Sequence, residues 1–376
     1  MIIKKIEIIN FKNIETAELD FSAKLNCVVG DNGQGKTNLL DAIYYLSLTK
    51  SSLGTPDSIV KGAFHDFFMV TASYQNYDLT KNETIHCSYK SGAGKMVKRN
   101  GKEYPRLSEH IGLVPVVIAS PNDNYLISDA AEARRKHINA LLSQLDDNYL
   151  NVVVKYNALL ANRNKLLKTP TQSSDEIIEV IDMQLVPLAQ QIHAVRLENI
   201  NKLLPIMQEI YDKISDGKDK IKIEYQSELT KTPLEILLKE NLEKDKILGH
   251  TSVGVHRDDM KLIIDGHSVK RYGSQGQQKS LTLALKLAQA KLIYAEKNVK
   301  PILLLDDICD KLDQQRVKAL INVVCDDDFG QIFLSDSSGK RIKEIIKQIG
   351  SDYKIFTTEN GCFVTKQNNK VTKLAK

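Results

Sequence analysis

One stretch of the sequence, Gly30-Asp31-Asn32-Gly33-Gln34-Gly35-Lys36-Thr37, matches the pattern G-x-x-x-x-G-K-[ST]. In such a loop the backbone N–H groups surround nucleotide phosphates, the lysine reaches the terminal phosphates and the hydroxyl binds Mg²⁺. An apolar run precedes the loop and a helical pattern begins at Lys36, so a helix N-terminus supports the same role. The alternative is a glycine-rich turn that matches by chance. Because pattern and context agree, we predict nucleotide binding by residues 30–37, with Thr37 as a Mg²⁺ ligand.

A second motif, Pro301 to Asp307 (PILLLDD), is typical of a buried strand that ends in two carboxylates. Ligands of open α/β sheets bind at the carboxyl ends of the strands. We predict that Asp306 holds Mg²⁺ directly or through water, and that Asp307 polarises the attacking water while Lys36 stabilises charge. The alternative is a core strand that ends in a solvated acidic turn. The glycine-rich loop makes that alternative less favoured, because the two motifs together are typical of a P-loop ATPase.

A third motif, Tyr272 to Lys279 (YGSQGQQK), precedes a helix expected from Lys279 to about Glu296. Asp306 lies 269 positions after Thr37, a wide spacing that favours an ABC-type ATPase with an inserted arm. Such an ATPase needs a signature loop that caps the ATP of a partner subunit, and small residues at a helix N-terminus suit an arriving anion. The alternative is the cap of an ordinary helix. The signature residues that we expect to act in trans are Ser274, Gln275, Gly276 and Gln277.

Alternating βα units in the last third of the chain predict a mostly parallel sheet. Residues from about 129 to 217 are different, because their apolar spacing is helical. One predicted helix, 175–215, would span roughly 60 Å and contains Pro187 and Pro205 as expected kinks. The predicted fold class is α/β: an ABC-type P-loop ATPase head, with a mixed sheet and flanking helices, and an inserted helical arm. The expected boundaries are 1–127 for the first part of the head, 128–246 for the arm and 247–376 for the second part of the head.

Composition excludes several other classes. The chain has 376 residues, with Lys+Arg 52, Asp+Glu 47 and a net charge of +5, and 42% of its residues are hydrophobic. These values are ordinary for a globular protein and exclude a disordered chain or a disulfide-stapled scaffold. Five dispersed cysteines without a C-x-x-C pair argue against a zinc site and favour a reducing compartment. We expect a cytoplasmic protein without a membrane partner, because no apolar run of ~18 residues and no signal peptide is found.

Two basic clusters could contact nucleic acid. The segment 90–102 (KSGAGKMVKRNGK) contains no acid, and its alternation around the hairpin dipeptide Asn100-Gly101 places Lys95 and Arg99 on one face. The second cluster contains Arg134 and Arg135. For each cluster alone a solvated charged face is the favoured interpretation. If these residues bind DNA, they contact phosphates, and binding is salt-sensitive without base specificity.

Over nearly its whole length the sequence resembles the RecF family of DNA repair ATPases. The resemblance rests on the motifs above and on four shorter strings. The signature S-Q-G-Q-Q-[RK] is specific, because transporters carry L-S-G-G-Q instead. Departures from the family pattern are Val255, where proline is usual, and Asp310 and Lys311, where S-E is usual. The shorter strings are Phe11-Lys12-Asn13, Ser120-Pro121-Asn122-Asp123, Arg134-Arg135 and Gly254-Val255-His256-Arg257-Asp258-Asp259.

The resemblance implies a function in recombinational repair, replication-fork maintenance and the SOS response to DNA damage. It implies an ATP-dependent homodimer that binds double-stranded or gapped DNA, helps load recombinase and releases DNA through weak, DNA-stimulated ATP hydrolysis. ATP and Mg²⁺ are the implied cofactors, RecR is the implied partner and RecO is a further candidate. The implied DNA contacts are Lys95, Arg99, Arg134 and Arg135.

Two alternatives stay open at this point. One is a nucleotide-gated DNA clamp with negligible turnover, since every motif serves dimerisation as well as hydrolysis. The other is a transporter-type ABC subunit, which is less favoured because Ser335-Asp336-Ser337 stands where transporters place a switch histidine.

Overall fold

The structure is a computed structural model that describes residues 1–62, 64–75, 82–169, 174–215, 217, 219–308, 312–324, 329–349, 352–367 and 370–372. Its residues form two compact units. Unit 1 contains residues 1–123, 209–217 and 279–376, and unit 2 contains residues 124–208 and 218–278. Residues 247–278, which the sequence-based boundaries assign to the head, therefore group with the helical unit.

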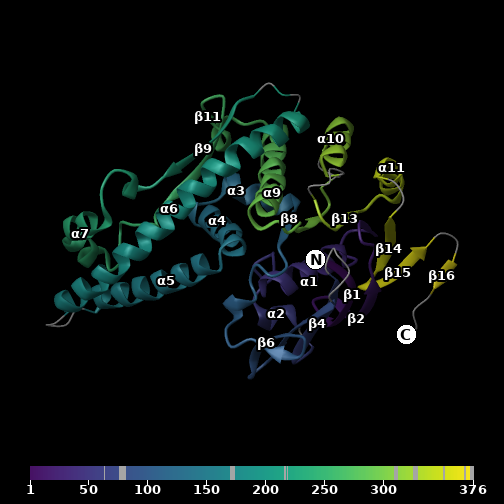
Figure 1. The fold of residues 1–376 in the computed structure, drawn as a ribbon, viewed down its shortest axis with the longest axis horizontal. Coiled ribbons are helices and arrows are strands. Elements are labelled where there is room, and N and C mark those ends of the chain that lie inside the picture. Colours follow the sequence, from purple (N-terminus) through teal and green to yellow (C-terminus); the bar gives the residue numbers. More distant parts are fainter. Residues whose placement is uncertain are drawn as a thin grey trace. The chain divides into compact units, whose positions relative to one another are not determined.

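The part of unit 1 that carries the glycine-rich loop is built on a seven-stranded sheet, several strands of which are labelled in Figure 1. Its order is β16-β15-β14-β3-β13-β12-β8, and the five strands from β14 to β8 run parallel. The remaining pairs, β14–β15 and β15–β16, are antiparallel. The sheet is therefore mixed, and its parallel part agrees with the βα pattern of the sequence. The strands are β3 (Leu25–Val29), β8 (Val116–Ala119), β12 (Ile302–Leu305), β13 (Ile332–Asp336), β14 (Tyr353–Glu359), β15 (Cys362–Gln367) and β16 (Lys370–Thr372).

A second sheet of unit 1 is antiparallel, with the order β2-β1-β4-β5-β6-β7. The rings of Phe11, Tyr45 and Phe68 pack edge to face, with centroids 5.2 to 5.8 Å apart, and all three are buried. This aromatic cluster joins the sheet to helix α1 (Lys36–Leu48). The strands are β1 (Ile2–Phe11), β2 (Ile14–Asp20), β4 (Phe67–Gln75), β5 (Asn82–Lys90), β6 (Gly94–Arg99) and β7 (Lys102–Glu103).

The turn between β6 and β7 has the predicted hairpin geometry. Asn100 and Gly101 both have positive φ, at 51° and 79°, which the tight turn requires. The Asn100 side chain also accepts a hydrogen bond from the Thr84 N–H at 2.8 Å, so it fixes the turn to β5. Unit 1 is completed by helical segments α2 (Asp57–Val60), α10 (Gln314–Val324) and α11 (Gly339–Ile349), and by most of α9 (Gln275–Lys297).

Unit 2 is mainly helical, as the sequence predicts for this part of the chain. Its long helices are held together by two buried arginines. Arg163 pairs with Asp182 and Asp245, and Arg196 pairs with Asp258. Its elements are α3 (Tyr125–Ser128), α4 (Ala131–Leu145), α5 (Asp147–Lys168), α6 (Ser174–Ser215, with 209–215 in unit 1), α7 (Leu234–Leu248), α8 (Val269–Tyr272), β9 (Ile221–Gln226), β10 (Asp259–Ile264) and β11 (His267–Ser268).

The predicted helix 175–215 corresponds to α6, which begins one residue earlier and continues through Pro187 and Pro205. Among the described helices, none combines the length and hydropathy that a membrane span needs. Cys27 and Cys87 are buried and Cys362 is exposed, and none of these three cysteines forms a disulfide.

Candidate nucleotide site

The glycine-rich loop connects β3 to α1, as predicted from the sequence. Gly35 precedes the helix with φ at 109°, and Gly33 has φ at 81°, conformations that favour glycine. The Lys36 ammonium is buried and donates to the carbonyl oxygens of Gly30 at 2.9 Å and Asp31 at 3.2 Å. The loop therefore curls around its own lysine, and the first N–H groups of α1 face the same space.

The two acids at the end of β12 meet this loop. The Thr37 hydroxyl lies 2.8 and 3.0 Å from the two carboxylate oxygens of Asp306. The Lys36 ammonium lies 3.6 Å from the nearer carboxylate oxygen of Asp307. Parallel pairing of β3, β13 and β12 brings the motifs together, because all three strands end at the same edge of the sheet. The structure thus joins four of the residues that the sequence singles out for catalysis and metal binding.

Ser335 connects the two acids. Its buried hydroxyl donates to Asp306 Oδ1 at 2.7 Å and accepts the Asp307 backbone N–H at 2.8 Å. Asp307 has φ at 45°, in the left-handed region that costs energy for a residue other than glycine. Ser335 therefore helps to hold the turn that directs the Asp307 carboxylate towards Lys36. The sequence drew attention to Ser335 only because it stands where transporters place a switch histidine. Its contacts with the two acids could not be inferred from the sequence.

The donor set fits Mg²⁺. Hydroxyl and carboxylate oxygens are its preferred ligands, and Mg²⁺ usually keeps several waters while it binds one or two carboxylates and phosphate oxygens. Burial raises the pKa of Asp306, partly offset by the hydrogen bonds from Ser335 and Thr37, so a nearby cation would relieve the cost of its charge. The described residues contain no cluster of three or more histidine, cysteine or acidic side chains that could hold a metal ion by themselves.

A clamp on the loop comes from residues that the sequence analysis missed. The end of β14 and the turn after it contact Gln34: the Gly361 N–H donates to the Gln34 carbonyl at 3.0 Å, and the Thr358 hydroxyl of β14 donates to the same oxygen at 2.8 Å. The Asn13 side chain donates to the Gly33 carbonyl at 3.3 Å. At Gly361, with φ at 77°, a Cβ atom would lie 2.1 Å from the Asn13 carbonyl oxygen. The dipeptide Asn360-Gly361 is a hairpin signal that could have revealed this turn.

The signature segment begins helix α9 earlier than expected. The helix starts at Gln275, and the first predicted helical residue was Lys279. Ser274 Oγ accepts the Gln277 N–H at 3.2 Å, and Gln277 Oε1 accepts the Ser274 N–H at 3.0 Å. This reciprocal pair is a capping box, which fixes the segment in helical geometry and leaves Ser274 exposed at the helix N-terminus. The exposed hydroxyl and the helix dipole are suited to an anion.

The string Gly254 to Asp259 is a structural centre of unit 2. Asp258 Oδ2 accepts Arg196 at 2.9 Å, and the Val255 carbonyl accepts the same guanidinium at 2.8 Å. His256 is held by Tyr156 at 2.8 Å. Val255 is buried, and it contacts Arg196 through its backbone carbonyl. The proline that is usual at this position would supply the same carbonyl, so the change to valine keeps the contact. The other departures, Asp310 and Lys311, lie outside the described residues.

Comparison with known proteins identifies the family. Residues 2–362 match the family model described as the RecF/RecN/SMC N terminal domain. The DNA replication and repair protein RecF of Bacteroides fragilis is 42% identical over 361 residues, which cover 96% of this chain and 97% of that protein. RecF of Flavobacterium johnsoniae is 41% identical and covers 95% of this chain and 99% of that protein. The chain belongs to the RecF family.

The solved structures agree with this assignment to the RecF family. A structure described as the recombination mediator protein RecF with ATP in the RecFOR pathway has 30% identity and a TM-score of 0.87, and it covers 97% of this chain and 98% of that one. An Smc head bound to the C-winged helix domain of ScpA has 15% identity and a TM-score of 0.56, a likeness of fold alone. The predicted fold class, an ABC-type head with a helical insert, is confirmed.

The four cations predicted to contact DNA in this RecF-family chain all have internal partners. Lys95 pairs with Asp57 at 2.8 Å, and Arg99 forms two bonds to Glu83. The face of β6 that they share also carries Val97, which is buried; the Lys95 side chain is 18% exposed and the Arg99 side chain 39%. The remaining two lie in unit 2: Arg134 is buried and bound to Asp259 at 2.7 Å, and Arg135 donates to the Asp258 carbonyl at 2.7 Å.

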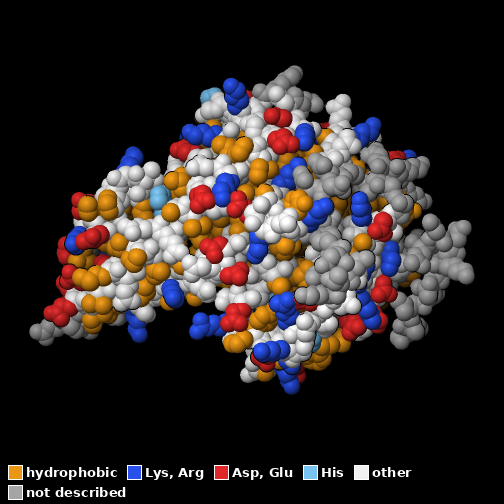
Figure 2. All heavy atoms as spheres, viewed as in Figure 1, with side chains coloured by type: hydrophobic (Ala, Val, Ile, Leu, Met, Phe, Trp, Pro, Cys, Tyr) orange, Lys and Arg blue, Asp and Glu red, His pale blue; other side chains and the backbone are white. Residues whose placement is uncertain are grey.

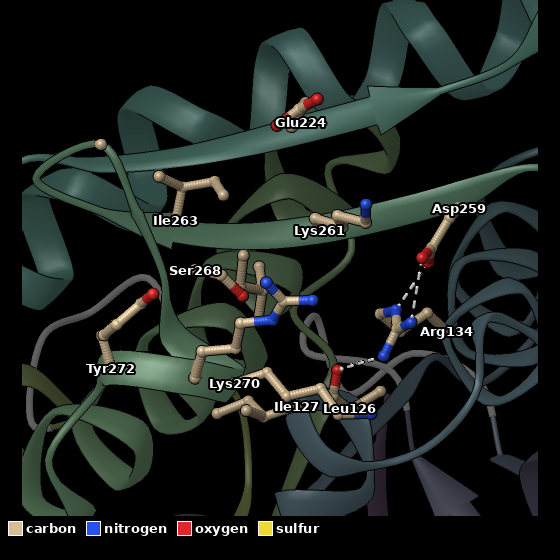
Figure 3. Close-up of a pocket in the computed structure, with 13 residues that line it drawn as sticks. Leu126, Ile127, Arg134, Glu224, Asp259, Lys261, Ile263, Ser268, Lys270 and Tyr272 are labelled. Carbon is tan, nitrogen blue, oxygen red and sulfur yellow. Dashed lines mark hydrogen bonds and ion pairs between the residues drawn. The ribbon is translucent and has the colours of Figure 1, made fainter.

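A hollow of about 570 Å³ in unit 2 is lined by residues next to the signature segment (Figure 3). Arg134 and Asp259 form one end of it, with their ion pair drawn as dashed lines. Lys261, Lys270 and Arg271 also line the hollow, and none of them forms an ion pair with a residue that the structure describes. The sequence analysis missed these three cations, because they are dispersed along a segment that also contains acids.

Proposed function

We propose that this chain is an ATP-dependent DNA-binding protein of recombinational repair and replication, which hydrolyses ATP to ADP and phosphate. The observation that carries the ATPase assignment is the meeting of Thr37 with Asp306 and of Lys36 with Asp307, across 269 positions of sequence. Membership of the RecF family supports the repair function, since the relatives are DNA replication and repair proteins and a solved relative contains ATP.

In the proposed reaction, the loop 30–37 binds the ATP phosphates through its backbone N–H groups and Lys36. Thr37 and Asp306 would hold Mg²⁺, and the bound ion would supply positive charge to balance the negative charge of the phosphates. Asp307 orients the attacking water for in-line displacement, and its turn is fixed by Ser335. Gln34, held by the β14–β15 turn, keeps the loop in the conformation that accepts phosphate.

We also propose that two copies form a head-to-tail dimer in which Ser274, Gln275, Gly276 and Gln277 of one subunit cap the ATP bound by the other. The capping box supports this, because it presents the Ser274 hydroxyl at a helix N-terminus whose dipole favours the γ-phosphate. ATP then joins the subunits and hydrolysis separates them.

For double-stranded or gapped DNA we propose phosphate contacts from Lys261, Lys270 and Arg271, with Lys95, Arg99, Arg134 and Arg135 in supporting positions. An Arg–carboxylate pair must break before its cation can bind phosphate, whereas the first three residues have no such pair among the described residues. Partners that carry the RecR and RecO functions, and recombinase loading, are further parts of this proposal, supported by the RecFOR context of the solved relative.

The ATPase proposal is tested by phosphate release with and without duplex DNA. Asp307→Asn should keep ATP binding and lose turnover by 10²-fold or more, because its amide cannot orient water as a carboxylate does. Lys36→Ala should lose ATP binding as well. The control is Lys239→Ala, an exposed lysine of α7 in unit 2. If the wild type releases no more phosphate than Asp307→Asn, the chain is a clamp without turnover and the enzyme proposal fails.

A further inference from the structure

A groove runs between the first half of α6 and helix α7 in unit 2. Its volume is about 490 Å³. Apolar side chains from both helices form its floor and walls, so it offers the kind of surface that proteins normally cover. These side chains are Ile178, Met183, Val186, Leu238 and Leu242.

One apolar side chain of this groove, Met183, is 65% exposed, whereas Ile178 and Leu238 are each only 2% exposed. Val180 and Ile177 are 55% and 44% exposed on neighbouring turns of α6, but they do not line the groove. A second hollow of about 530 Å³, lined by parts of α5 and α6, also includes Met183. Met183 therefore stands between two hollows, with apolar surface on both sides. Contiguous exposed apolar surface of this kind marks an interaction site more often than it occurs by chance.

The rim of the groove is acidic. Five carboxylates line it, against one lysine, and that lysine, Lys239, already pairs with Glu235 at 3.0 Å. Glu176 and Glu179 form no ion pair with any residue the structure describes. Figure 2 shows acidic and hydrophobic side chains intermixed over the part of unit 2 where α5, α6 and α7 lie. A surface with this charge repels nucleic-acid phosphates and attracts a basic partner.

We propose that this groove binds a basic amphipathic helix of a partner protein. Apolar side chains spaced i, i+3 or i+4, i+7 would enter the groove, and lysine or arginine on their flanks would pair with Glu176 and Glu179. Methionine suits such a site because its flexible thioether adapts to different apolar side chains. None of the residues proposed to bind phosphate lines the groove, and the interaction does not depend on the proposed ATPase activity.

Helix α11 of a second copy does not suit the groove. The chain has a basic amphipathic helix of its own, α11, with Lys340 and Arg341 in its first turn. However, Ile342, Ile345 and Ile346 of α11 are buried within unit 1. Its apolar face is therefore occupied, and a second copy of the chain cannot supply it without unfolding part of unit 1.

The test uses a fluorescent 18-residue helical peptide with leucine at the i, i+3, i+4 and i+7 spacing and lysine elsewhere, with fluorescence anisotropy as the readout for binding to the full chain. Met183→Asp removes apolar surface and Glu179→Lys reverses rim charge. Both residues lie on the surface of α6, so folding should persist, and circular dichroism checks this. The matched controls are Val154→Asp on α5, which lines neither hollow, and Glu198→Lys on α6, outside the groove.

We expect each groove variant to weaken peptide binding at least tenfold, and each control to stay within twofold of the wild type. ATP turnover should be unchanged in all four variants. Equal weakening by Glu198→Lys and Glu179→Lys would mean a diffuse charge effect and would overturn the proposal. A Met183→Asp protein that binds the peptide as tightly as the wild type does would also overturn the proposal. So would a solution mass that is lower for Met183→Asp than for the wild type, because the groove would then join two copies of this chain.

Discussion

Removal of the Ser335 hydroxyl should separate catalysis from nucleotide binding. In Ser335→Ala the Asp307 N–H loses its acceptor and Asp306 loses a donor, within a fully buried position. A lost bond to a charged group costs about 1.5–3 kcal/mol, and an unsatisfied buried donor costs about 1–3 kcal/mol. If roughly 2 kcal/mol of this lost free energy is added to the activation barrier of hydrolysis, turnover falls about 30-fold. Binding should change by less than threefold, because the loop 30–37 and Lys36 are untouched.

Ser47→Ala is the matched control. Ser47 is a buried serine of α1 in the same unit, and its hydroxyl has no hydrogen-bond partner among the described residues. The chemical change is identical, yet no bond is lost, so turnover and stability should stay close to the wild type. The assay is steady-state phosphate release at saturating ATP, with binding of a fluorescent ATP analogue measured separately. Turnover of Ser335→Ala within twofold of Ser47→Ala would refute the proposed role of Ser335, as would an equal loss of binding and turnover.

Three further predictions follow from single contacts. Gly361→Ala places a Cβ 2.1 Å from the Asn13 carbonyl oxygen and should displace the β14–β15 turn from Gln34. The affinity for ATP should then fall about tenfold or more in titration calorimetry. An unchanged affinity would show that this turn does not support the glycine-rich loop. Arg163→Met leaves the buried Asp245 carboxylate without its cation and should lower the free energy of unfolding by about 3–5 kcal/mol in urea, whereas a loss below 1 kcal/mol would contradict the buried-pair argument. Burial lowers the pKa of His256 to about 4, so the unfolded chain binds the imidazole proton more tightly than the folded chain does. The free energy of unfolding should therefore fall by up to roughly 3 kcal/mol from pH 6.5 to 4. His256→Gln should reduce this dependence of the unfolding free energy on pH, and an unchanged dependence would contradict the role given to His256.

The glycine-rich loop and the strand that ends in two acids could be predicted from sequence because their signals are local. The loop 30–37 and the strand before Asp306 each carry their own pattern, and parallel pairing then determines where they meet. Ser335 could not be assigned its role in this way. Its hydroxyl reaches both acids because Leu334 pairs with Leu305, a register that depends on the assembled sheet.

The charged residues were harder to interpret for a related reason. Alternation correctly places Lys95 and Arg99 on one face of a strand, but both cations pair there with carboxylates of this chain, Asp57 and Glu83. Arg134 lies in a basic cluster in sequence, yet its carboxylate partner, Asp259, is 125 positions away. Local patterns record which charges are neighbours along the chain, and only the tertiary structure shows which of them are neutralised.

The central proposal is that ATP joins two subunits through the signature segment, and solution mass tests it most directly. Light scattering should give a monomer of 42.3 kDa without nucleotide and with ADP, and twice that mass with ATP and Mg²⁺ in the Asp307→Asn protein, which holds ATP unhydrolysed. Ser274→Arg added to Asp307→Asn should bind ATP and remain a monomer, because the larger side chain fills the space of the γ-phosphate. A mass that ATP leaves unchanged, or a dimer that survives Ser274→Arg, would contradict the account.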